Sequence, residues 1–181
     1  DGNATATLDT SLINYGGLVS GDTLTGTYSG VFSAGEDVGA NKTVTITSVY
    51  DGADLNNYTI TSQASTTADI TAKSLTATAS AANKEYDASS AATTTLTLSG
   101  FIGTETVTST NSSTFNNKNV GTGKTVTVNS ITLADGTNGG LASNYTISAG
   151  QTTTANITAK ALTVSGITAS NKTYDSTTSA T

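Results

Sequence analysis

The sequence contains no Cys, His, Trp, Met or Pro, and all seven of its basic residues are Lys. Without Cys and His, the chain cannot assemble a Ser/His/Asp or Cys/His catalytic arrangement. The same two absences exclude a zinc site built from His or Cys ligands. The composition therefore predicts a protein that is not an enzyme and that needs no cofactor.

Positive charge is also scarce, because seven Lys stand against 13 acidic residues and give a formal net charge of −6. Nucleic acids and anionic membrane surfaces are bound by clustered Lys or Arg, so neither is an expected partner. No apolar run has the length of a signal peptide or a membrane span, and no insertion into a membrane is expected. Because the chain begins abruptly at Asp1, we expect it to be part of a longer protein.

Thr is the commonest residue, and it alternates with apolar residues in several short runs. Examples are TVTIT (43–47), TLTL (95–98) and TVTV (125–128). A period of two is typical of strands that bury one face, and Thr suits the exposed face of a pleated sheet. No segment has the apolar spacing of an amphipathic helix. The pattern predicts an all-β protein.

Long stretches of the sequence occur twice. NYTITSQASTTADITAK (57–73) returns as NYTISAGQTTTANITAK (144–160), at an offset of 87, and VGANKTVTI (38–46) returns as VGTGKTVTV (120–128), at an offset of 82. NKEYDAS (83–89) returns as NKTYDST (171–177). The five extra residues of the second copy fall in a Gly/Asn-rich stretch, which indicates a loop insertion.

An irregularity in the alternation occurs in both copies. Apolar positions step by two from Val44 to Ile46 and then by three to Val49, and the second copy repeats this at Val126, Val128 and Ile131. A step of three turns the buried face over unless the strand bulges. We therefore predict a bulge or kink near residues 47–48 and another near residues 129–130.

Each unit of about 87 residues contains many short strand-like runs, a density typical of an immunoglobulin-like sandwich. Asp54 lies four residues before Tyr58, which is the spacing of a tyrosine corner, and Tyr145 is the equivalent of Tyr58 in the second copy. We predict tandem sandwich units that form an elongated rod. A grasp-like mixed sheet is the alternative.

The sequence resembles a known family in the motifs KEYDAS and KTYDST, the following NVGTGKTVTV and the closing NYT and TTTANITAK. These are similar to the YDG-type repeats, related to MBG domains, of very large bacterial surface and filamentous-haemagglutinin-like adhesins. The usual Tyr-Asp-Gly reads Tyr86-Asp87-Ala88 and Tyr174-Asp175-Ser176 here, and Asp1-Gly2 fits the end of another copy. The resemblance implies an extracellular spacer module without catalytic residues.

The repeats suggest a division of the chain into a first unit (residues 1–72), a second unit (residues 73–160) and the opening strands of a third (residues 161–181). The first unit then lacks the strand that residues 73–86 supply to the second unit. An alternative division, 1–87 and 88–175, leaves nothing missing. No flexible linker separates the units, because Gly/Ser-rich stretches are absent at ITAKSLT (70–76) and ITAKALT (157–163).

The repeated Tyr-Asp pairs have a structural and a functional interpretation. In the structural one, Tyr86 and Tyr174 close one end of a sandwich, and Asp87 and Asp175 cap the following turn. In the functional one, aromatic rings and carboxylates bind a glycan or Ca²⁺. The carboxylates named as candidates for Ca²⁺ are Asp51, Asp54 and Asp87.

Three functions follow from these observations. The first is a structural stalk that projects an adhesive region from a bacterial cell surface, with neighbouring repeats of the same chain as its partners. The second is a module that itself binds carbohydrate. The third is head-to-tail association, in which residues 161–175 of one copy supply the strand that the first unit of another copy lacks.

Overall fold

The computed structural model describes residues 2–179, and its regular structure is almost entirely β. Two short 3₁₀ helices, η1 (Leu55–Asn57) and η2 (Ala142–Asn144), accompany the strands, and residues 2–179 contain no α-helix. The strands are β1 (Thr5–Ala6), β2 (Thr25–Phe32), β3 (Gly39–Asp51), β4 (Ser65–Ile70), β5 (Lys73–Ser74), β6 (Thr76–Ala81), β7 (Lys84–Glu85), β8 (Ala91–Ala92), β9 (Thr94–Ser99), β10 (Val107–Phe115), β11 (Gly121–Asp135), β12 (Tyr145–Thr146) and β13 (Thr152–Thr158). The all-β prediction is confirmed.

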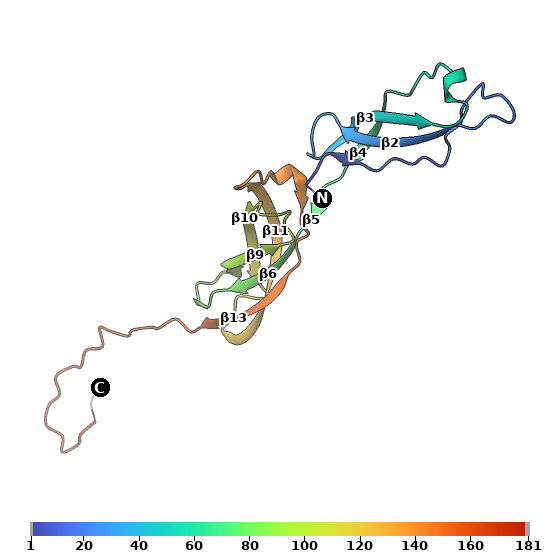
Figure 1. Ribbon diagram of the computed structural model, residues 1–181. Helices are drawn as coiled ribbons and strands as arrows, with labels where there is room; N and C mark the ends of the chain where they lie inside the picture. The colour runs from blue at the N-terminus through green and yellow to red at the C-terminus, as the bar shows by residue number, and fades with distance from the viewer. Residues whose placement is uncertain (1, 180–181) are drawn as a thin grey trace.

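The strands form four sheets within an elongated molecule (Figure 1). One sheet has the order β1-β2-β3-β4 and lies within the first unit. The second unit contains a sheet of order β7-β13-β11-β10-β8 and two pairs, β12-β5 and β6-β9. Figure 1 shows the C-terminal segment leaving the second unit at the end opposite to the first unit. The boundaries of the units stay a prediction.

Four strands of the large sheet in the second unit match the four strands of the large sheet in the first. β1, β2, β3 and β4 have the sequence positions and antiparallel pairings of β8, β10, β11 and β13. The first unit has no strands in the positions of β6, β7 and β9 within the described residues. The sequence repeat is therefore also a structural repeat, although only the second unit has the full set of strands.

The second unit contains most of the buried apolar side chains. One cluster consists of Phe115, Val126, Ala155 and Ile157, and Tyr86 packs against it. Another consists of Leu75, Val107 and Tyr145. In the first unit, Val44 is the one apolar side chain among the described residues that is fully buried. The closed core therefore lies in the second unit.

The two predicted bulges have different outcomes. Opposite Ser112 and Ser113 the partner residue changes from Ser130 to Val128, so Asn129 is the extra residue of a bulge and that prediction is confirmed. The prediction at Thr47-Ser48 is wrong, because β2 and β3 pair without a shift. A strand without a bulge keeps Tyr50 on the inner face of β3 and leaves Val49 exposed.

A different bulge, which the alternation did not predict, occurs in both units. The pairing shifts by one residue between Gly39 and Lys42 in the first unit and between Gly121 and Lys124 in the second. In each bulge a residue with positive φ donates its backbone N–H to a side chain of the neighbouring strand: Asn41 to Asp69 at 2.7 Å and Gly123 to Asn156 at 2.8 Å. A Gly or Asn suits this left-handed position.

No helix within residues 2–179 is long and apolar enough to cross a membrane.

Two further findings concern the ends of the molecule. Residues 159–179 form no strand, and Leu162, Val164 and Ile167 are more than 80% exposed. Asp1, which the sequence assigns to another Tyr-Asp-Gly, lies outside the described residues, whereas Gly2 is described and has φ of +69°.

Candidate functional site

The Tyr-Asp motif of the second unit lies in a turn between β7 and β8. Asp87 accepts hydrogen bonds from Lys84 Nζ at 2.8 Å and from the backbone N–H of Ser89 at 2.9 Å. Ala88 has φ of +64°, which is the left-handed conformation that favours Gly. The geometry gives a physical reason why Gly would suit the position after Tyr-Asp, and why Ala there is strained.

The side chains around this turn pack on the core. Tyr86 contacts the Phe115 cluster, and its backbone N–H donates to Thr158 O at 2.9 Å. Lys84 Nζ lies 5.7 Å from the centre of the Phe115 ring and donates to two carbonyl oxygens of the turn. The hydrogen bond from Lys84 lowers the pKa of Asp87. All these contacts lie within the second unit.

The same turn forms at residues 171–177, outside any sheet. Asp175 bonds Lys172 Nζ at 2.7 Å and the N–H of Thr177 at 2.9 Å, and Ser176 has φ of +62°. The pKa of Asp175 is lowered by the hydrogen bond from Lys172. Tyr174, however, is 90% exposed. The turn is therefore formed by local contacts, whereas burial of its tyrosine needs a core.

Tyr58 and Tyr145 anchor the loop that precedes the second strand of each large sheet. Tyr145 Oη donates to Glu105 at 2.7 Å and accepts the N–H of Ile102 at 3.1 Å. Tyr58 Oη makes the matching bonds with Asp22, at 2.7 Å, and the N–H of Val19, at 3.0 Å. These partners lie 36 to 43 residues upstream, so each tyrosine ties distant parts of its unit together.

The two phenols differ in their surroundings. The hydrogen bond to Asp22 raises the pKa of Tyr58, and burial raises the pKa of Tyr145, with the bond to Glu105 adding to it. Asp54, whose spacing suggested a tyrosine corner, instead accepts the N–H of Thr23 at 2.9 Å.

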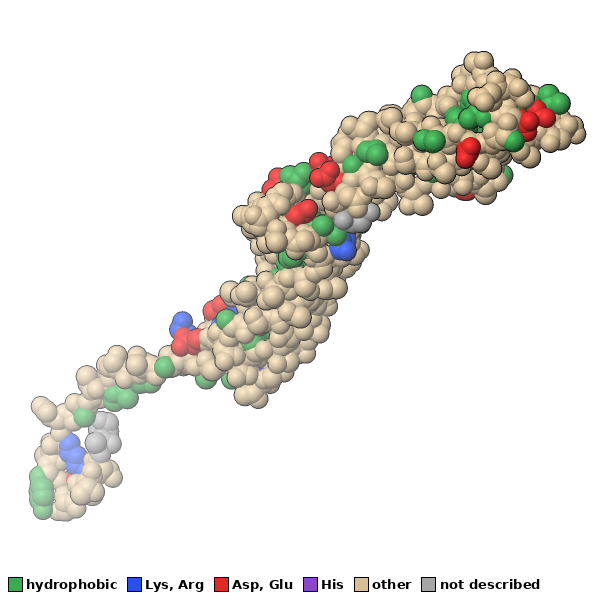
Figure 2. All heavy atoms as spheres, in the orientation of Figure 1, with side chains coloured by type: hydrophobic (Ala, Val, Ile, Leu, Met, Phe, Trp, Pro, Cys, Tyr) green, Lys and Arg blue, Asp and Glu red, His purple; other side chains and the backbone are tan. Residues whose placement is uncertain are grey.

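The three carboxylates that the sequence suggests for Ca²⁺ each make hydrogen bonds to a different part of the chain. Asp51 accepts the N–H of Gly52, Asp54 that of Thr23, and Asp87 bonds the Lys84 turn. Within residues 2–179, no three acidic side chains are placed to share a metal ion. Figure 2 shows few charged side chains on the visible face, most of which is backbone and uncharged side chains. Each of the three carboxylates has a hydrogen-bonding role inside its own unit.

The joint between the units is held by a side chain that the repeats did not single out. Asn144 accepts the backbone N–H of Val38 at 2.9 Å and donates to Asp37 Oδ1 at 2.8 Å. Gly2 lies against Ile102, since a Cβ placed on Gly2 would be 2.5 Å from Ile102 Cγ2. β4 ends at Ile70 and β5 begins at Lys73, so only two residues connect the sheets. Direct contacts across the joint limit its freedom to bend.

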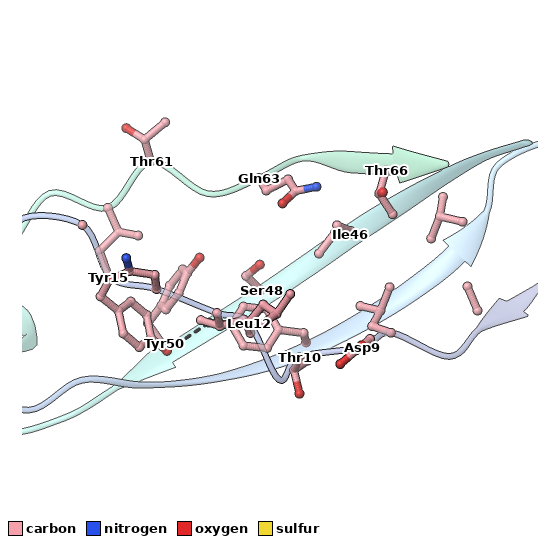
Figure 3. Close-up of a pocket in the computed structure, with 18 of the residues that line it drawn as sticks. Asp9, Thr10, Leu12, Tyr15, Ile46, Ser48, Tyr50, Thr61, Gln63 and Thr66 are labelled. Carbon is pink, nitrogen blue, oxygen red and sulfur yellow. Dashed lines mark hydrogen bonds between the residues drawn. The ribbon is translucent and has the colours of Figure 1, made fainter. Parts of the chain in front are cut away.

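A groove of about 1120 Å³ opens along the inner face of the first unit. Figure 3 shows Leu12 and Tyr15 on one side, Ile46 and Tyr50 on β3, and polar residues such as Gln63 on the other side. Other apolar lining residues are Leu8, Leu18, Leu24, Tyr28, Val44, Tyr58 and Ile60. The groove therefore exposes side chains of the kind that form a core.

Three tyrosines in this groove pack against one another. Tyr15 and Tyr28 share a hydrogen bond of 3.0 Å between their hydroxyls, and this bond raises the pKa of Tyr28 to about 12. The ring of Tyr50 meets both of the others edge to face, at 6.4 and 6.1 Å between centroids. The three tyrosines thus bond and pack against one another and do not form a flat aromatic surface.

The corresponding face of the second unit is closed by residues 73–85. β5 pairs with β12, β6 with β9, and β7 with β13, so this one segment binds three different strands. Leu75 inserts into the cluster of Val107 and Tyr145 and is only 5% exposed. Closure of a unit depends on this segment.

Comparison with known proteins identifies the second unit. Residues 71–155 match the YDG domain family, so a YDG domain lies at these residues. The YDG part of the resemblance seen in the sequence is confirmed, and the match includes the Tyr86 turn and Tyr145. No curated protein and no solved structure matches the chain. The relation to MBG domains and to adhesins stays a prediction.

Proposed function

We propose that this chain is a piece of a stalk: tandem immunoglobulin-like units that form an elongated spacer in a secreted or cell-surface bacterial adhesin or filament. In this role it catalyses no reaction, and its partners are neighbouring units. The YDG domain at residues 71–155 and the matched strands of the first unit support a tandem arrangement.

The observation that carries the proposal is the joint. A spacer must keep successive units in a fixed relative orientation. A two-residue connection with the hydrogen bonds of Asn144 across it is suited to that purpose. Gly/Ser linkers would instead behave as flexible coils. The neutral polar surface in Figure 2 also suits a module that stays extended without binding to its neighbours sideways.

The test is small-angle scattering of the full chain at low concentration, with two Asn variants. Asn144→Ala removes both bonds across the joint, whereas Asn57→Ala changes the equivalent position of the first unit, which makes no side-chain hydrogen bond to another described residue. We expect the wild type and Asn57→Ala to give the same elongated particle. Asn144→Ala should give a broader and on average shorter distribution of lengths.

The proposal is contradicted if the wild type already shows the breadth of a freely bending pair of units. It is also contradicted if Asn144→Ala leaves every dimension of the particle unchanged, because the hydrogen bonds of Asn144 would then not stiffen the joint.

A second candidate function is carbohydrate binding in the groove of the first unit. The observation in its favour is the cluster of Tyr15, Tyr28 and Tyr50 with nearby amide and carboxylate groups. The edge-to-face packing of these rings weighs against it. Titration of the chain with a set of glycans, followed by tyrosine fluorescence, tests this candidate directly.

A further inference from the structure

The groove of the first unit and the unpaired segment at residues 160–175 are complementary, and we propose that they bind each other between two copies of the chain. The segment of one copy would lie in the groove of the next as residues 73–88 lie on the second unit. This proposal goes beyond the spacer role, since a spacer needs no association between copies.

The groove is lined by residues of the first unit that are equivalent to those around Leu75 in the second unit. Leu75 contacts a cluster that includes Leu98, Val107, Tyr145 and Ile147. The repeat places Leu24, Tyr58 and Ile60 at the positions of Val107, Tyr145 and Ile147, and these three residues line the groove together with Leu12. Leu12 is 90% exposed. A leucine from outside the first unit would complete the cluster.

The segment supplies that leucine and continues with the matching alternation. KALTVSGITASNKTYDST (160–177) is a copy of KSLTATASAANKEYDAS (73–89) with small changes and one inserted residue. Leu162 and Val164 correspond to Leu75 and Ala77, and Ile167 then follows after a step of three. Gly166, with φ of +84°, can form the bulge that restores the phase. The apolar side chains would thus all face the groove.

The hydrogen bonds by which residues 73–88 hold the second unit also have equivalent donors and acceptors in the segment and the first unit. In the second unit, Asn83 Oδ1 accepts the N–H of Asn156 at 2.7 Å. The N–H of Tyr86 donates to Thr158 O at 2.9 Å. The equivalent bonds between copies would join Asn171 to the N–H of Asp69, and Tyr174 to Thr71 O. Tyr174, which is 90% exposed in the single chain, would be covered.

The joint within the chain provides a further contact between copies. Asn57 is the equivalent of Asn144, and Asn119-Val120 are the equivalents of Asp37-Val38. The side chain of Asn57 would therefore bond Val120 of the copy that donates the segment, as Asn144 bonds Val38. Val120 is 53% exposed in the single chain, so the surface that this contact would use is free.

The position of the two elements determines the kind of assembly. The groove belongs to the first unit, and the segment leaves the second unit at the opposite end of the molecule (Figure 1). A head-to-tail interface that does not close generates open chains rather than fixed dimers. In a longer protein, the same groove would accept the equivalent segment of a preceding unit.

The experiment measures the mass of the full chain by light scattering over a wide concentration range. We expect the weight-average mass to rise without a plateau from 18.0 kDa to at least twice that value. Leu162→Asp with Ile167→Asp should abolish the rise, since two charges would enter an apolar groove. Thr163→Asp with Ser165→Asp adds the same charge at outward positions and should reduce it far less.

Both variants change a segment without a sheet partner in the single chain, so neither should alter the fold of the two units. Circular dichroism checks this. A synthetic peptide of residues 160–173, which contains no tyrosine, tests the groove separately, because it should change the tyrosine fluorescence of the chain and compete with association. Asn57→Ala should weaken association several-fold.

The proposal is overturned if the wild-type chain stays at the monomer mass throughout the range, or if the inward and outward variants associate equally. It is also overturned if the groove responds to glycans but not to the peptide, since the occupant would then be a carbohydrate. A monomeric chain with a stiff joint would leave the spacer function standing.

Discussion

The two units share four matching strands of their large sheets but have very different interiors. Val44 and Val126, at equivalent places in β3 and β11, are both fully buried. Ala155 in β13 is also buried, whereas its counterpart Ala68 in β4 is exposed. The difference follows from residues 73–85, which cover the second unit and have no counterpart on the first. One short segment therefore decides whether this fold has a closed core.

The largest effect is expected from Leu75, because this residue of segment 73–85 inserts into the core of the second unit. Leu75→Ala removes a buried side chain and should lower the free energy of unfolding of the second unit by about 2–5 kcal/mol. Leu162→Ala makes the same change at an exposed position and should have no measurable effect in dilute solution. Denaturant unfolding followed by hydrogen exchange resolves the two units.

If both alanine variants had the same effect, residues 73–85 would not be what separates the units. The pair of substitutions thus tests the comparison without changing any other contact.

A smaller difference is expected between the two anchoring tyrosines. Tyr145→Phe leaves Glu105 and the Ile102 N–H without their partner in a buried site, which should cost about 1–3 kcal/mol. Tyr58→Phe breaks the matching bonds beside the open groove, where water replaces the lost hydroxyl more easily. Thermal unfolding of the two variants should show the larger loss for Tyr145→Phe, and an equal loss would contradict the difference in burial.

The turn after Tyr86 provides a stabilising substitution. Ala88→Gly restores Tyr-Asp-Gly and relieves the left-handed conformation of Ala88, with an expected gain of about 1 kcal/mol or less. Ser176→Gly makes the same change in the unattached turn and should leave unfolding of both units unchanged. A lower melting temperature for Ala88→Gly would show that the left-handed conformation is not strained.

The smallest effect concerns acid. The pKa of Asp87 is lowered in the folded chain from its usual 3.8, because the carboxylate bonds Lys84. Its contribution to stability is therefore complete above pH 3.8 and is lost as the pH falls through the lowered value. Asp87→Asn should melt slightly below the wild type at pH 7, and the difference should shrink toward pH 2. A difference that stays constant over this range would exclude the ion pair as its cause.

Much of the fold could be predicted from the repeats and the alternation. Period-two runs located β3, β9 and β11, and the repeat located the equivalent strands of the other unit. The bulge at Asn129 was predictable because Ile131 breaks the phase. The same reasoning failed at Thr47, since it counted Val49 as inward although the ring of Tyr50 takes the inner face instead.

The contacts that hold the units together were harder to predict. Tyr58 and Tyr145 were recognised from their repeated position, but their partners lie far upstream and no local spacing identifies them. Asn144 is followed by the same three residues as Asn57, and only the fold shows that it spans the joint. Long-range polar contacts depend on which loops the sheets bring together, and this information is not contained in a local pattern.

The most direct test of this account is native-state hydrogen exchange on the full chain at low concentration. Equivalent amides of β3 and β11, and of β4 and β13, are compared within one sample. We predict much stronger protection for β11 and β13, because residues 73–85 close the second unit and its strands open only with the whole unit. Equal protection of the two units would contradict the claim that this segment completes the fold.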